Sequence, residues 1–239
     1  SVDLRSSPGQ VRLKPGTIME KVSITPEMCS TWVRFAAPLL ANATRAEGQL
    51  SAHLEHAALT LGKPESASAR GTIQIHEGRA GAGPLVREII TLASELRGIL
   101  RQKPLGSGAA PRSDWVTLPP QEIEFSLVDG AVHHNRFEMR VNDIHMVTSG
   151  TVFTDQTLEL VCEIPVRDEW LQQNRLLAPL HGRTFKIPIR GTLGAPKIDK
   201  RILGDIGKQM LEGVTDDLRD TTKDLLRDQL EKGLRDLFK

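Results

Sequence analysis

The chain has 239 residues, of which 39% are hydrophobic, 26% charged and 4% aromatic, and its formal net charge at pH 7 is +1. This composition excludes a disordered chain, and the length suffices to bury a sizeable core. The chain has no long stripe of Lys and Arg residues. Nucleic-acid binding is therefore disfavoured, because it draws most of its affinity from neutralised phosphates. No apolar run reaches the roughly 20 residues of a membrane-spanning helix, so no transmembrane segment is expected within this chain.

The first predicted elements are strands over residues 11–24, broken by a Pro-Gly turn at residues 15–16. A helix is expected next, because Thr25 suits the N-cap, Pro26 the first helical position and Glu27 the positive end of the helix dipole. Apolar residues then recur at helical spacing: Met28, Trp32, Phe35, Ala36 and Leu39. Pro38 is expected to kink or end this helix.

Alternating apolar residues predict two further strands, over residues 49–61 and 67–76. Residues 78–84, with the sequence GRAGAGP, are expected to form a flexible connection. Residues 85–101 then carry the spacing of an amphipathic helix. Residues 103–112 are rich in Gly, Pro and Ser, which indicates a linker and places the main internal boundary there.

The most informative stretch is the antiparallel meander that we predict over residues 121–164. Asp129-Gly130, Asn142-Asp143 and Asp155-Gln156 are turn signals that cut it into four segments of strand length. Apolar residues fall at every second position: Ile123, Phe125 and Leu127; Phe137, Met139 and Val141; Leu158, Leu160, Cys162 and Ile164. One face of such a sheet is apolar and is expected to pack against another apolar surface. No residue pattern in these strands indicates a catalytic group.

The same stretch carries a resemblance to a known family. The pieces are Val128-Asp129-Gly130, Ser149-Gly150-Thr151, the run DQTLEL over residues 155–160, the run IPIRGTL over residues 187–193 and Pro196-Lys197. Their order and spacing over about a third of the chain resemble the C-terminal region of the AsmA-like family of bacterial envelope proteins. A glycine-richer segment often precedes the DxTL turn in that family, where this chain has Ser149-Gly150-Thr151-Val152-Phe153.

The resemblance implies a periplasmic or envelope protein that handles phospholipid or another acyl-chain lipid in membrane biogenesis, with other envelope proteins as partners. Together with the sheet pattern it names candidate lining residues: Phe125, Leu127, Phe137, Met139, Val141, Phe153, Leu158 and Leu160. Each of these residues suits a packed core equally well. The chain begins at Ser1 in sequence that already reads as a strand, so we expect a piece of a longer protein whose membrane anchor lies outside it.

The expected fold class is α+β: a twisted, curved antiparallel sheet partly covered by amphipathic helices. We divide the chain into a sheet-plus-helix half (1–103), a linker-like segment (104–113), the meander (114–203) and a long amphipathic helix (204–239). Both halves contain the same order of elements: a strand, a helix that carries a Trp, the dipeptide Pro-Leu, and a strand that begins with Gly-Thr. Two related halves and a chance likeness both fit this order.

Several residue patterns suggest a site but lack the residues that its chemistry needs. His133, His134 and His145 lie in adjacent predicted strands, but neighbours in a strand point to opposite faces, so no metal is expected. The glycines 78, 81 and 83 lack the order of a dinucleotide fingerprint and no P-loop lysine follows. No GxSxG elbow supports a hydrolase triad. Cys29 and Cys162 form no CxxC motif and are expected to be buried free thiols, a disulfide being the alternative.

Three classes of function remain from the sequence. The first is a non-enzymatic, lipid-handling envelope protein without a cofactor, which we favour. The second is a structural or protein-interaction module with a filled core. The third, a hydrolase or transferase, requires one cleft that gathers polar residues now distant in the sequence.

Overall fold

The computed structural model describes residues 2–3, 9–81, 83–100, 115–142, 144–169, 181–199, 201 and 203–204. The predicted linker over residues 104–113 lies outside these residues. So does the predicted C-terminal helix over residues 204–239, apart from its first residue. Both therefore stay predictions.

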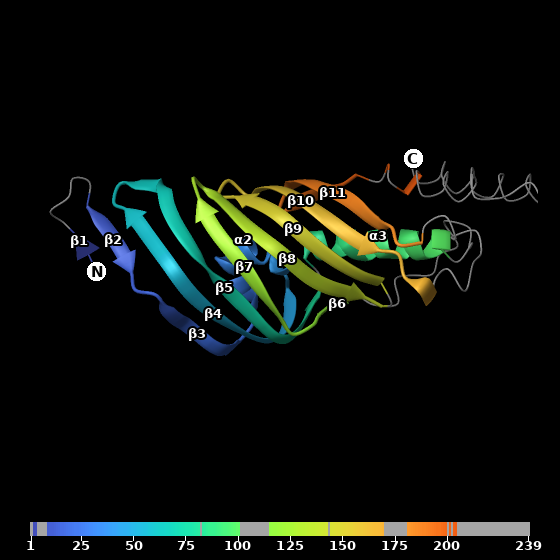
Figure 1. Cartoon of the computed structure of the whole chain (residues 1–239), viewed down its shortest axis with the longest axis horizontal. Coiled ribbons are helices and arrows are strands. Elements are labelled where there is room, and N and C mark those ends of the chain that lie inside the picture. Colours follow the sequence, from blue (N-terminus) through green and yellow to red (C-terminus); the bar gives the residue numbers. More distant parts are fainter. Residues whose placement is uncertain are drawn as a thin grey trace, which may run out of the picture.

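Within the described residues, twelve strands form one antiparallel sheet (Figure 1). The strands are β1 (Val2–Asp3), β2 (Gln10–Leu13), β3 (Gly16–Ser23), β4 (Arg45–Thr60), β5 (Lys63–Gly81), β6 (Trp115–Leu118), β7 (Gln121–Val128), β8 (Ala131–Val141), β9 (Ile144–Phe153), β10 (Thr157–Pro165), β11 (Thr184–Thr192) and β12 (Ala195–Ile198). The prediction of a β-rich antiparallel fold is confirmed. The α+β class is supported only in part, because strands greatly outweigh helices in the part of the chain that is described.

The strand order is β1-β2-β4-β5-β6-β8-β9-β10-β11-β12, with β3 also paired to β4, and β7 paired to both β5 and β8. The long strands β4 and β5, of 16 and 19 residues, explain this pattern. Each is long enough to pair with two shorter strands in succession along one edge. The sheet therefore runs continuously from the N-terminal strands into the meander.

The turns of the meander follow their sequence signals. Asp129 and Gly130 both have positive φ, at 48° and 73°, as a two-residue turn of type I′ requires. Asn142 takes a φ of 55° at the next turn. At the third turn, the Asp155 carboxylate accepts hydrogen bonds from the backbone N–H and the hydroxyl of Thr157, at 2.8 and 2.6 Å. The predicted hairpins are thus confirmed.

Three short helical pieces replace the single helix expected after Thr25: α1 (Pro26–Ser30), α2 (Val33–Ala36) and the 3₁₀ turn η1 (Pro38–Leu40). Thr25 is the N-cap, as predicted, and its hydroxyl accepts from the Met28 N–H at 3.3 Å. The break follows Thr31, whose hydroxyl bonds the carbonyl oxygens of Glu27 and Met28. Such side-chain bonds compete with the helical backbone pattern. The later helix is α3 (Pro84–Leu100), close to its predicted range.

The expected flexible connection over residues 78–84 is wrong in its first half. Residues 78–81 are the end of β5, where Gly78 pairs with Gly48 on one side and with Leu118 on the other. Gly48 and Gly78 allow the backbones of β4 and β5 to approach closely. A Cβ on Gly48 would lie 2.0 Å from the Glu77 carbonyl oxygen, and a Cβ on Gly78 would lie 3.1 Å from the Glu47 carbonyl oxygen. Glycine clusters in a sequence indicate loops only where the backbone is free of such neighbours.

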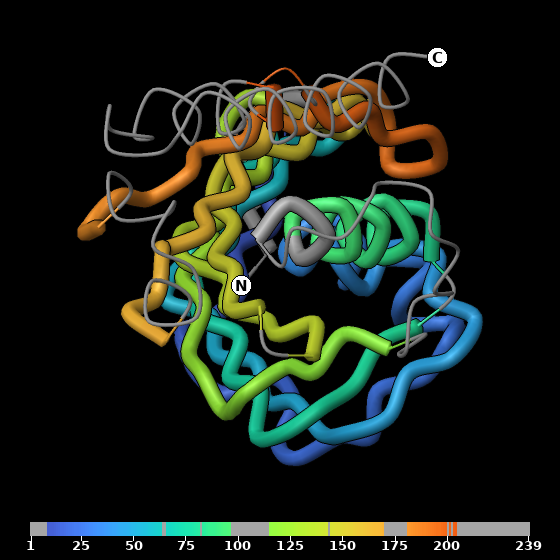
Figure 2. The backbone as a smooth tube through the Cα atoms, turned by 90° about the vertical axis from the view of Figure 1, so that its right-hand side faces the viewer, coloured from blue at the N-terminus to red at the C-terminus, as the bar shows by residue number. Residues whose placement is uncertain are grey.

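The sheet curves around the helices, which lie on its inner side (Figure 2). Helix α2 contacts β8 and β9, whereas α3 contacts β5, β6 and, from the far end of the strand order, β12. We call the side that bears the helices the helix-side face and the other the outer face. The core of the protein lies between the helix-side face and the helices.

Candidate functional site

The register of the strands assigns every paired residue to one of the two faces, because directly paired residues of neighbouring strands project to the same side. One row of pairs crosses seven strands of the helix-side face: Leu13, Ala57, Ala69, Leu127, Val132, Val152 and Leu158. A neighbouring row contains Leu54, Gly71, Phe125, His134, Gly150, Leu160 and Ile189. Neither row contains a charged residue.

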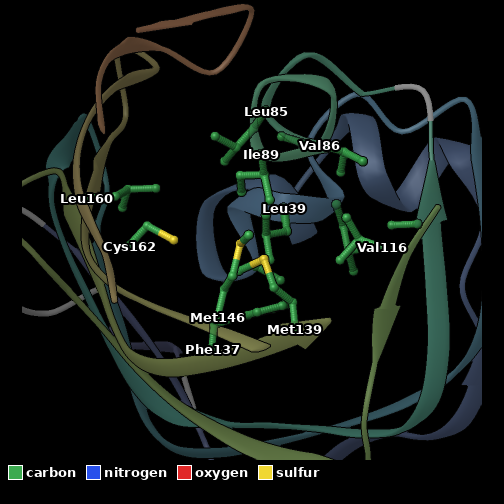
Figure 3. Close-up of a cluster of buried hydrophobic side chains, with 14 of the residues drawn as sticks. Leu39, Leu85, Val86, Ile89, Val116, Phe137, Met139, Met146, Leu160 and Cys162 are labelled. Atoms are coloured by element: carbon green, nitrogen blue, oxygen red, sulfur yellow. The ribbon is translucent and has the colours of Figure 1, made fainter. Parts of the chain in front are cut away.

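Under the helices, the helix-side face is a filled core (Figure 3). Leu39 of η1 lies at its centre, with Leu85 and Ile89 of α3 on one side of it and Phe137, Met139 and Met146 on the other. All six side chains are at most 1% exposed. This end of the sheet holds its own hydrophobic core, as an ordinary two-layer domain does.

The sheet continues beyond the helices at the end formed by β2 and by the turn between β4 and β5 (Figure 1). We call the helix-side residues there the uncovered segment. All of them are partly or fully exposed: Val11, Leu13, Ala57, Leu59, Ala67, Ala69, Phe125 and Leu127. Leu13 is 54% and Leu59 39% exposed. The uncovered segment is an apolar continuation of the core that no described helix covers.

Two polar residues lie buried on the helix-side face where the uncovered segment meets the core. They are His134 on β8 and Thr148 on β9, exposed by 4% and 1%. The His134 Nε2 lies 3.5 Å from the Thr148 hydroxyl, and the ring meets Phe137 edge-on at a centroid distance of 6.4 Å. Burial is the main cause that lowers the pKa of His134 to about 4, so the imidazole is neutral at pH 7.

The predicted lining residues fall into three groups. Phe137, Met139 and Val141 are fully buried in the core, and Leu158 and Leu160 are buried on β10. Phe125 and Leu127 belong to the uncovered segment. Phe153 pairs with Ala131 and so lies on the outer face, because its neighbour Val152 takes the helix-side position. The structure therefore brings seven of the eight residues to one face and leaves two of them accessible.

Six members of the uncovered segment were not among the predicted lining residues: Val11, Leu13, Ala57, Leu59, Ala67 and Ala69. A signal for them exists in the sequence. In β4 the apolar positions are even-numbered up to Leu54 and odd-numbered from Ala57, and the structure has a bulge between Leu54 and His56. A change of phase in an alternating pattern predicts such a bulge, after which the opposite parity faces the core.

The three histidines that were considered as metal ligands have separate partners in the structure. His133 lies on the outer face, with its Nδ1 2.7 Å from the Thr151 hydroxyl, opposite to His134. His145 lies 3.3 Å from the Glu138 carboxylate. Among the described residues, no group of three or more His, Cys, Asp or Glu side chains is placed to hold a metal ion.

A serine and a histidine, the residue types of a hydrolase site, lie in contact between β4 and β5. The Ser51 hydroxyl lies 2.8 Å from His76 Nε2 and also accepts the Lys21 N–H at 2.9 Å. A nucleophilic serine needs its histidine base to be oriented by a third group. Among the described residues, no carboxylate forms a hydrogen bond with His76. The Ser51–His76 pair therefore lacks the third group of a triad.

Both cysteines are free and buried, as expected from the sequence. Burial raises the pKa of the Cys29 thiol to about 11 and that of Cys162 to about 12. Since the thiolate is the reactive form, neither residue has the character of a nucleophile. Cys162 packs into the core from β10 (Figure 3).

None of the helices in the described part of the chain is long and apolar enough to span a membrane. Comparison of the whole chain with protein-family models, with curated proteins and with solved structures finds no match. The resemblance to AsmA-like proteins therefore stays a prediction from the residues that carry it.

Proposed function

We propose that this protein is a non-enzymatic binding protein that holds the acyl chain of a lipid along the uncovered segment. The observation that supports this proposal is the continuity of the helix-side face. A single apolar surface passes from a helix-filled core to strands on which Leu13 and Leu59 are exposed. Exposed apolar surface that continues a core is typical of a binding site for an apolar partner.

The chemistry of the uncovered segment favours a hydrocarbon chain. Its side chains are aliphatic apart from Phe125, and the small side chains of three alanines and one valine leave the surface of the strands shallow. The segment extends over β2, β4, β5 and β7, which at about 4.8 Å per strand is about 14 Å across. Each methylene group removed from water there contributes about 0.8 kcal/mol. Flexible chains fit such a surface without requiring directed polar contacts.

The resemblance to AsmA-like proteins supports the same proposal and extends it to a place and a purpose. On that basis we propose a role in the periplasm or cell envelope, in guiding phospholipid or another acyl-chain lipid during membrane biogenesis. Other envelope proteins are the proposed partners. A membrane anchor outside this sequence would keep the protein at its membrane.

A structural or protein-interaction module is the second candidate. It is favoured by the filled state of the core, in which Phe137, Met139 and Val141 are fully buried by the protein's own helices. In that case the uncovered segment would be covered by a protein partner. The two candidates differ in whether purified protein carries lipid.

The experiment compares two substitutions of equally exposed residues on opposite faces. Leu59 is 39% exposed within the uncovered segment, and Val161 is 38% exposed on the outer face. Native mass spectrometry and lipid extraction are applied to wild type, Leu59→Asp and Val161→Asp after incubation with phosphatidylglycerol and phosphatidylethanolamine vesicles. We expect bound lipid in wild type and Val161→Asp, and at least a tenfold loss in Leu59→Asp, because a charge disrupts apolar burial.

Protein that stays free of lipid in all three samples would overturn the lipid proposal. Equal loss of lipid in both variants would also contradict it, since binding would then not depend on the helix-side face. Concentration-dependent association of lipid-free wild type, measured by light scattering and abolished by Leu59→Asp, would support the interaction module instead.

A further inference from the structure

The end of the sheet formed by β2 and by the turn between β4 and β5 exposes leucines on paired strands. We call residues 9–14 and 57–63, which pair with each other there, the tip. Seven large hydrophobic side chains are exposed in the described structure, and three of them lie in the tip: Leu13 at 54%, Leu59 at 39% and Leu61 at 42%. Single exposed apolar residues are ordinary, but a group of neighbours marks a contact surface.

The charges of the tip have one sign. The tip contains Arg12, Lys14 and Lys63 and no acidic residue, whereas the whole chain has 31 basic and 30 acidic residues. All three basic side chains are exposed. Asp3 of β1, opposite Gln10, is an acidic residue beside the tip, and its charge offsets one of the three. The tip is therefore apolar and basic at the same time.

An anionic bilayer matches both properties. Leucine side chains that enter the zone between headgroups and acyl chains leave water, while the long stems of neighbouring lysines keep the ammonium groups at headgroup level. Each basic residue near an anionic membrane adds to the attraction. The tip also lies at the end of the molecule away from α3, so no described helix stands between it and a flat surface (Figure 1).

We propose that the tip attaches the protein to a bilayer that contains anionic phospholipid. Its leucines enter the bilayer interface, and Lys14 and Lys63 contact lipid phosphates. The acyl-chain function would use this contact, because Leu13 and Leu59 belong both to the tip and to the uncovered segment. Attachment, however, does not require that a lipid leave the bilayer. The inference therefore goes beyond the proposed function and can fail separately from it.

The test measures flotation of the purified protein with two kinds of vesicle. One kind consists of phosphatidylcholine alone, and the other of equal parts of phosphatidylcholine and phosphatidylglycerol. We expect wild type to float with the mixed vesicles and to bind the phosphatidylcholine vesicles at least about tenfold more weakly, because the lysines then face no net negative surface.

Leu61→Asp tests the apolar part of the tip, and Val161→Asp is its matched control. The two residues are similarly exposed, at 42% and 38%, and both variants gain one negative charge, but Val161 lies on the outer face of β10. Leu61 is not a member of the uncovered segment. We expect Leu61→Asp to weaken binding to the mixed vesicles at least about tenfold, since a leucine side chain no longer leaves water. Val161→Asp should stay within about twofold of wild type.

The double variant Lys14→Gln, Lys63→Gln tests the basic part. Its control is Arg190→Gln, Lys197→Gln, which removes two exposed positive charges that face each other across β11 and β12. We expect the tip variant to lose about 25-fold in affinity for the mixed vesicles, about fivefold for each lysine. The control should lose less than about threefold, because its charges lie farther from the bilayer than a Debye length.

The outcomes separate the two proposals. Equal binding to both kinds of vesicle, or equal loss in a tip variant and its control, overturns the inference. Wild type that carries lipid in native mass spectrometry but never floats overturns the role of the tip and leaves the acyl-chain function intact. Wild type that floats without carrying lipid supports attachment and contradicts the acyl-chain function. Self-association without vesicles, measured by light scattering and lost in Leu61→Asp, assigns the tip to a second copy of the chain and also overturns the inference.

Discussion

At the scale of single residues, His134 links the stability of the fold to pH. Burial lowers its pKa from 6.5 to about 4, with a smaller contribution from the neighbouring His133. Below pH 6.5 the unfolded chain takes up a proton at this position, while the folded chain takes one up only near pH 4. Protons therefore favour the unfolded state across this interval, and the folded protein loses stability as the pH falls.

We expect the free energy of unfolding of wild type to fall by up to about 3 kcal/mol between pH 6.5 and pH 4, from this residue. Urea denaturation at several pH values measures this fall. His134→Leu is the control, and its stability should change much less over the same interval. Three carboxyl groups have a pKa below the ordinary value, which is 4.5 for Glu27 and 3.8 for Asp155 and Asp199. Their protonation therefore changes the stability mainly below this pH interval. Parallel pH profiles of the two proteins would contradict the assignment.

At the scale of elements, the pairing of β9 with β10 depends on a glycine in the middle of β9. Gly150 has a φ of 143°, and a Cβ there would lie 2.3 Å from the Glu159 carbonyl oxygen and 2.8 Å from the Leu160 Cα. Backbone atoms of a central strand cannot give way to such contacts without breaking the ladder. The close contact between β9 and β10 therefore explains why this chain has a glycine at the centre of its Ser149-Gly150-Thr151 segment.

We expect Gly150→Ala to destabilise the protein by about 2 kcal/mol or more, because the added methyl group meets the backbone of β10. Gly194→Ala is the matched control, since a Cβ at Gly194 meets no atom within 4 Å. Thermal unfolding of both variants checks the prediction. A shift in melting temperature that is equal in the two would show that β9 accommodates the side chain.

The elements that could be predicted from the sequence are those set by local signals. Asp129-Gly130 fixed a hairpin because both residues readily take positive φ, and Thr25-Pro26 located a helix start because both suit their cap positions. Residues 78–81 could not be placed from local signals, because a glycine in a loop and a glycine between two close strands look alike in sequence. Only the partner strand, here β4, distinguishes them.

At the scale of the whole molecule, the site was harder to predict than the sheet. Alternation identified the apolar face of β7, β8 and β10, and it correctly grouped Phe125, Leu127 and Phe137 on one side. On β9 it failed, because Phe153 lies on the outer face. It could not tell which part of that face the helices cover, because coverage depends on where α1 to α3 dock. The residues left uncovered, such as Leu13 and Leu59, come from the other end of the chain.

The division of the face into a covered and an uncovered part predicts two levels of local stability. Strands β8 and β9 pack under α2, and their helix-side residues Met139 and Met146 are fully buried. The turn end of β4 and β5 is held by strand pairing, with small residues such as Ala57 and Ala69 facing inward. Regions with fewer buried apolar contacts open more readily, since less apolar surface has to be exposed.

We expect backbone amides of residues 137–148 to exchange hydrogen at least about tenfold more slowly than those of residues 57–69 in lipid-free protein. Addition of phosphatidylglycerol vesicles should slow exchange over residues 57–69 and leave residues 137–148 unchanged, because only the uncovered segment gains a cover. Hydrogen–deuterium exchange with mass spectrometry measures both segments in one experiment, and Leu59→Asp should remove the lipid effect. Equal exchange in the two segments without lipid would contradict the division of the face, whereas slow exchange over residues 137–148 that responds to lipid would place the chain under the helices instead.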